Sequence, residues 1–151
     1  MRLLDGANVR RHSAPRRVAS LILFTTAGLK VTSLVAGGQA VLLSPDPVLD
    51  IPTWLMLLVI GAVEFAMAAL LVGTWCDDET VGTLLLWFIM CSVFYRIGHS
   101  VGSNELCPCL GLLPKVLFWS TQATNLVTLS LLAVLALTGF ILLRNGRRLS
   151  P

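Results

Sequence analysis

The chain has 151 residues, of which 56% are hydrophobic and only 13% are charged, and its formal net charge is +3. Soluble domains carry about a quarter of their residues as charged side chains. This composition therefore excludes an ordinary water-soluble domain, and the small net charge gives no indication of a nucleic-acid partner. Arginines gather near the two ends of the chain, which is typical of an integral membrane protein surrounded by membrane lipid.

The chain begins with a basic segment, residues 1–17, followed by an apolar run over Val18–Leu43. A hydrocarbon core needs about 20 helical residues, so this run predicts a transmembrane helix. A second interpretation treats the run as a cleaved signal peptide, because Arg16-Arg17 precede it and Gly38-Gln39-Ala40 could be a cleavage site. The length of the run and the presence of Lys30 favour a retained helix.

Three further apolar runs are long enough to cross a membrane: Trp54–Trp75, Thr80–Val101 and Val116–Leu143. Backbone polar groups in lipid must be satisfied within the segment, so these runs are predicted to be helices. The sequence thus predicts an all-α fold, a four-helix transmembrane bundle with up-down topology over residues 18–143. The very short turn Cys76–Glu79 predicts that the second and third helices are antiparallel neighbours.

Lysine and arginine set the orientation of such a bundle. The first loop has no basic residue, the third loop has only Lys115, and both ends of the chain carry arginines. Residues 1–17 and the basic tail 144–151 are therefore expected in the cytoplasm. For a bacterial inner membrane, the loop between the third and fourth helices then lies on the exoplasmic side, where disulfides persist.

Two opposite charges fall within predicted helices, Lys30 in the first and Glu64 in the second. Ionisable residues in membrane spans usually face the bundle interior and pair with one another. We therefore expect an ion pair between Lys30 and Glu64 that fixes the register of two helices. A proton or quinone site at this pair is the functional alternative.

A polar group is expected near the exoplasmic end of the third helix. Cys91, Tyr95 and His99 are spaced four apart and share a helix face, and Arg96 lies among them. The fourth predicted helix carries a polar run at the same depth: Ser120, Thr121, Gln122, Thr124 and Asn125. These side chains predict either a polar pocket or inter-helix hydrogen bonds with Arg96 reaching the interface.

The loop between the third and fourth helices contains Cys107-Pro108-Cys109. A disulfide within so short a ring is strained and exchanges readily, so Cys107 and Cys109 are predicted to be a redox pair. Cationic groups favour the reactive thiolate, and Arg96 and His99 are expected to adjust its reactivity. Binding of a soft metal such as Cu(I) and an inert pair remain the alternatives. No metal-binding set and no cofactor are assigned.

Two other cysteines, Cys76 and Cys91, are expected to be packed thiols that do not reach the Cys107–Cys109 pair.

Several motifs together resemble the DoxX-like, MauE-type family of redox-associated membrane proteins. They are Gly28-Leu29-Lys30, Ala62-Val63-Glu64-Phe65 and Cys107-Pro108-Cys109-Leu110-Gly111. Pro108 and Leu110 stand where the family often has Gly and Phe. The resemblance implies a four-helix membrane protein linked to disulfide formation or thiol redox in exported proteins.

The sequence therefore predicts a membrane protein that takes part in thiol–disulfide redox or maturation of exported proteins, with oxidoreductase-like activity. Its expected partner is an exported thiol protein or a thioredoxin-like protein. The alternative is a non-catalytic membrane scaffold or a protein that handles a small solute or a soft metal.

Overall fold

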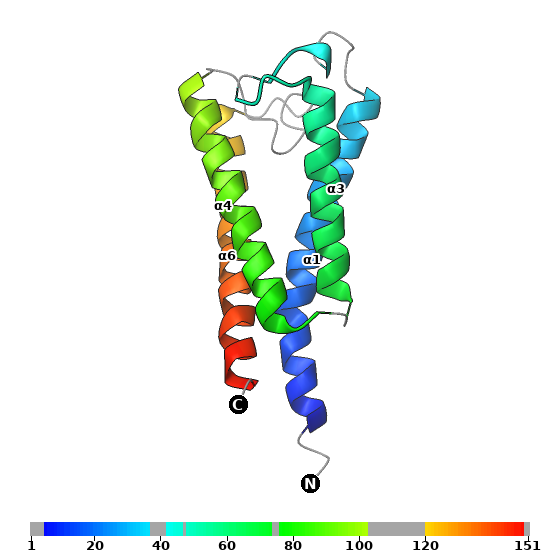
Figure 1. Ribbon diagram of the computed structural model, residues 1–151, viewed down its shortest axis with the longest axis vertical. Coiled ribbons are helices and arrows are strands. Elements are labelled where there is room, and N and C mark those ends of the chain that lie inside the picture. The colour runs from blue at the N-terminus through cyan, green and yellow to red at the C-terminus, as the bar shows by residue number, and fades with distance from the viewer. Residues whose placement is uncertain (1–4, 37–41, 47, 74–75, 103–119, 150–151) are drawn as a thin grey trace.

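The computed structural model describes the chain in five ranges: 5–36, 42–46, 48–73, 76–102 and 120–149. These residues form four long helices, α1 (Asp5–Ala36), α3 (Thr53–Val72), α4 (Asp78–Gly102) and α6 (Thr121–Leu149). Figure 1 shows the helices running alternately up and down, with the start of α1 and the end of α6 at the same end. The predicted all-α, up-down four-helix bundle is confirmed.

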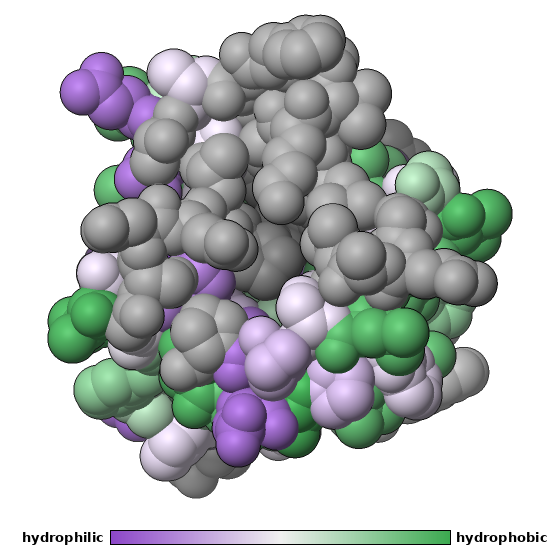
Figure 2. All heavy atoms as spheres, turned by 90° about the horizontal axis from the view of Figure 1, so that it is seen from above, coloured by the Kyte–Doolittle hydropathy of each residue, from purple (hydrophilic) through white to green (hydrophobic). Residues whose placement is uncertain are grey.

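Each helix contains a stretch long and apolar enough to cross a membrane: Ala14–Ala36, Thr53–Val72, Asp78–Val101 and Gln122–Arg147. Large hydrophobic side chains on these stretches are exposed on the outside of the bundle, including Phe65, Trp87, Phe94 and Leu137. Viewed from the loop end, hydrophobic side chains also reach the perimeter on several sides (Figure 2). An apolar exterior of this kind suits lipid rather than water, and the chain is a multi-pass membrane protein.

Several helix ends differ from the prediction. α1 begins at Asp5, within the basic segment, and α3 ends at Val72 because Gly73 adopts an extended conformation. α6 begins at Thr121 instead of Val116, since the Ser120 hydroxyl accepts a hydrogen bond from the Ala123 amide at 3.2 Å and caps the helix. The predicted end of the first helix, Leu43, comes after residues 37–41, which lie outside the described ranges. The predicted end of the second helix, Trp75, itself lies outside them.

The helices pack mainly as two pairs, α1 with α3 and α4 with α6, whereas α3 and α4 have little contact. The predicted α3–α4 neighbours are indeed antiparallel, but the short turn does not force them together. Glycines explain why α4 prefers α6. A Cβ atom added at Gly82 would lie only 2.8 Å from the Gly139 carbonyl oxygen, and one at Gly146 only 2.7 Å from the Glu79 backbone. Small residues allow such close approach in membrane bundles.

The buried core of the bundle lies toward the end that holds the termini. Its members come from all four helices: Ala19, Leu23, Met67, Ala68, Leu71, Val81, Leu85, Ile89, Leu135 and Leu142. Arg16 ties the α3–α4 connection to α1 at this end, donating to the Gly73 and Cys76 carbonyls and to the Asp78 carboxylate. The helices are therefore packed together at one end, and toward the other end a cavity lies between the two pairs.

Candidate functional site

A cavity of about 580 Å³ lies between the two helix pairs, in the half of the bundle away from the termini. Its wall is mostly apolar and comes from all four helices and the first loop. The apolar lining includes Val59, Val63, Phe94, Leu131 and Leu135, and the other lining residues include Lys30, Glu64, Cys91, Tyr95 and Arg96. From the sequence, either a polar pocket or inter-helix hydrogen bonds were expected at this end. The cavity instead combines an apolar wall with a few polar groups.

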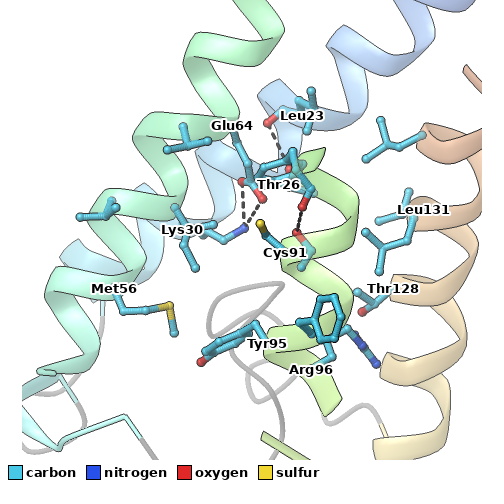
Figure 3. Close-up of a pocket in the computed structure, with 18 of the residues that line it drawn as sticks. Leu23, Thr26, Lys30, Met56, Glu64, Cys91, Tyr95, Arg96, Thr128 and Leu131 are labelled. Atoms are coloured by element: carbon cyan, nitrogen blue, oxygen red, sulfur yellow. Dashed lines mark hydrogen bonds and ion pairs between the residues drawn. The ribbon is translucent and has the colours of Figure 1, made fainter. Parts of the chain in front are cut away.

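The Lys30–Glu64 ion pair forms part of the cavity wall (Figure 3). Lys30 Nζ lies 2.7 Å from one Glu64 carboxylate oxygen and 2.8 Å from the other. The side chains are only 2% and 8% exposed. α1 and α3 are adjacent and antiparallel, which brings these residues together, so the predicted pair is present. Nothing in the sequence indicates that the pair borders a cavity.

The helix face predicted to carry Cys91, Tyr95 and His99 lies partly along the cavity and partly in the bundle interior. Cys91 and Tyr95 line the cavity, and His99, one turn further on, is buried with its ring centre 6.0 Å from that of Tyr95. Arg96 is half-buried and donates to the Asn125 side chain at 2.8 Å. This bond joins α4 to α6, as the inter-helix alternative predicted.

The first loop covers the cavity at the end away from the termini. Val48 and Leu49 line the cavity from this loop. Both of their amides donate to one carboxylate oxygen of the buried Asp46, at 2.9 and 3.1 Å. The other Asp46 oxygen accepts the Tyr95 hydroxyl at 2.5 Å. The sequence does not indicate this role of Asp46, because its partner Tyr95 lies 49 residues away.

The structure describes two of the four cysteines, Cys76 and Cys91. Cys107 and Cys109 lie outside the described residues, as does Lys115, so their geometry stays a prediction. Cys76 is half-buried against the core, as expected of a packed thiol. The prediction of a packed thiol is wrong for Cys91. This residue is exposed and lines the cavity, because α3 and α4 separate there. Among the described residues there is no cluster of three or more His, Cys, Asp or Glu side chains that could hold a metal ion.

The fold and the site define a helical multi-pass membrane protein with an apolar cavity bordered by a buried ion pair. No family model, no curated protein and no solved structure matches the chain.

Proposed function

We propose that this chain is a bacterial inner-membrane protein of the DoxX-like, MauE-type class, with both termini in the cytoplasm. In this proposal Cys107 and Cys109 form an exoplasmic redox pair that exchanges disulfides with an exported thiol protein or a thioredoxin-like partner. The exchange transfers two electrons between two dithiol/disulfide couples: one pair of thiols is oxidised to a disulfide as the other disulfide is reduced.

The observation that carries the proposal is the separation of the two ends of the bundle. The arginine-rich start of α1 and end of α6 lie at one end of the bundle, and Gly102 and Thr121 lie at the other (Figure 1). The chain between these two residues, 103–120, contains Cys107 and Cys109 and is called the cysteine segment below. The positive-inside rule assigns the arginine-rich end to the cytoplasm. The cysteine segment is then connected to helix ends on the opposite side of the membrane.

Arg96 and His99 support the proposal from the last two turns of α4. Arg96 and His99 precede Cys107 by 11 and 8 residues, and a cation near a thiolate favours its charged, reactive form. We assign them the role of adjusting the reactivity of the pair. They are positioning residues in this proposal, since neither is assigned a contact with the partner.

Trapping of mixed disulfides tests this function. Cys107→Ser and Cys109→Ser are expressed separately in intact cells, and proteins linked to each are separated on non-reducing gels. Replacing the resolving cysteine should accumulate a reducible adduct with an exported protein, because the remaining thiol cannot release it. Cys76→Ser and Cys91→Ser are the matched controls and should trap nothing. Absence of adducts from both variants of the pair, with normal protein levels, contradicts the function.

The cavity favours a second function, the handling of a small apolar solute. Its volume of about 580 Å³ falls within the range of about 300–1,000 Å³ that is typical of ligand pockets. In that case the Cys107→Ser/Cys109→Ser double variant would keep full function in cells. A soft-metal protein would instead bind Cu(I) stoichiometrically and lose it in the same variant.

A further inference from the structure

The cavity opens toward the lipid between α3 and α4. Val59, Val63 and Phe94 line the cavity and are also 49%, 43% and 67% exposed. α3 and α4 hardly touch, so no helix packing closes this side of the cavity wall. An apolar cavity of this kind does not retain water well. A molecule that enters from the bilayer through this gap would find a predominantly apolar wall.

Arg96 places a positive charge in this wall. It lies five residues before Val101, the end of the candidate span, which is about 7.5 Å along a helix. Among the described residues, the only hydrogen-bond partner of Arg96 is the neutral side chain of Asn125. The ion pairs among the described residues are formed by Arg16, Lys30 and Arg147, not by Arg96. A cation within a membrane span is stabilised by an anion, and arginine binds carboxylates with strong, directional hydrogen bonds.

The charge of Lys30 is already balanced. Both oxygens of the Glu64 carboxylate accept hydrogen bonds from Lys30 Nζ, so this part of the wall has no net charge. Beyond it the cavity continues along apolar α6 side chains, Leu131 and Leu135. Among the described residues, Arg96 is thus the cavity-lining cation with no acidic partner, and it lies near the interface end of a mostly apolar wall. This is the polarity of a single-chain amphiphile with an anionic head.

We propose that the cavity binds a long-chain fatty carboxylate, with its head on Arg96 and its chain between the two helix pairs. The site shares Arg96 with the proposed adjustment of the redox pair, but it includes neither Cys107 nor Cys109, so palmitate binding and disulfide exchange are measured by different variants. The proposal therefore stands or falls separately from the proposed thiol exchange.

Native mass spectrometry of the delipidated, full-length protein tests the site. The probes are palmitate and hexadecanol, which have the same chain length and differ in the charge of the head. Palmitate should bind the wild-type protein at least about tenfold more tightly than hexadecanol, since the charge-assisted contact is lost with the alcohol. Equal affinities for the two probes would overturn the proposal.

Variants locate the site. Arg96→Gln should abolish the preference for palmitate, and Arg96→Lys should retain most of it. Leu131→Trp should weaken both probes, because the larger ring occupies the cavity. Arg147→Gln, which removes an exposed arginine at the other end of the bundle, is the control and should change nothing.

Two results would count against the assignment: a palmitate preference that survives Arg96→Gln, or one that depends on Arg147. If Arg96→Gln fails to fold, the wild-type comparison and Leu131→Trp still decide. The Cys107→Ser/Cys109→Ser variant should bind palmitate like wild type, whether or not the thiol exchange is real.

Discussion

Lys30 and Glu64 bring two charges into membrane-spanning helices, where removing charge from water is expensive. The pair is tolerated because each charge satisfies the other through two short hydrogen bonds and both side chains are nearly inaccessible. Such a pair adds little net stability compared with two apolar residues, but breaking it leaves one uncompensated charge. The pair therefore acts mainly as a constraint on how α1 and α3 align.

Lys30→Met is predicted to lower the free energy of unfolding by about 3–5 kcal/mol, the range for removing one partner of a buried pair. Lys30→Met/Glu64→Leu should recover most of that loss, because no lone charge remains. Unfolding in mixed micelles at increasing denaturing detergent measures both. A double variant no more stable than the single one would contradict a structural pair.

The control for this experiment is Arg147→Gln. Arg147 also forms an ion pair, with Glu79 at 3.5 Å, but the two side chains are 69% and 43% exposed. Exposed pairs contribute about 0–1 kcal/mol, so this variant should unfold almost like wild type. The comparison separates the effect of a buried charge from the general loss of a cation.

At the level of helices, glycines allow the close packing of α4 against α6. Gly82→Ala is predicted to destabilise the α4–α6 pair by about 1–3 kcal/mol, the usual effect of overpacking. The added methyl would lie 2.8 Å from backbone atoms of Gly139 and Leu143, which cannot move aside like a side chain. The same detergent titration measures the loss.

Gly28→Ala is the matched control for the glycine experiment. A Cβ atom at Gly28 would meet nothing within 4 Å, and alanine is the better helix former. This variant should be neutral or slightly more stable. Equal destabilisation by the two substitutions would mean that the close contact of α4 with α6 does not hold the bundle together.

The start of α4 gives a pH-dependent prediction. The Thr80 amide donates to the Asp77 carboxylate at 3.0 Å and the Thr80 hydroxyl donates at 2.8 Å. These bonds lower the pKa of Asp77 below its ordinary value of 3.8. A lowered folded-state pKa contributes stability above the unfolded value, and this contribution disappears as the pH falls through the folded pKa.

Asp77→Asn keeps a capping side chain but cannot titrate. The stability of wild type relative to Asp77→Asn should therefore be constant near neutral pH and decline once the pH drops below about 4. Thermal unfolding of the two proteins across this range measures the difference. A constant difference down to strongly acid pH would show that the Thr80 hydrogen bonds do not depend on the Asp77 charge.

For the whole molecule, the number and direction of the helices were predictable. Each apolar run shows by its own hydropathy and length that it can cross a membrane, and successive membrane spans must alternate in direction. The Lys30–Glu64 pair was predictable for a related reason, since a charge in hydrocarbon has few available partners. Helix ends were less so. The apolar residues before Ser120 extended the predicted fourth helix, whereas the Ser120 cap sets its start.

The cavity could not be predicted, because it arises where two helix pairs separate and no single segment encodes that. The pairing of α4 with α6 depends on close contacts of Gly82, Gly139 and Gly146, and glycine in a membrane helix does not by itself specify a partner. The cover of the cavity is equally non-local, since it depends on the hydrogen bond between Tyr95 and Asp46.

Thiol labelling in intact cells decides whether the cysteine pair faces the exoplasmic side. After gentle reduction, a membrane-impermeant maleimide is added to a Cys76→Ser/Cys91→Ser variant, so that Cys107 and Cys109 alone can react. Both thiols should label before the membrane is broken, while a cysteine introduced in the 144–151 tail should label only afterwards. Labelling of Cys107 and Cys109 only after lysis would contradict the orientation and, with it, the proposed exchange with exported proteins.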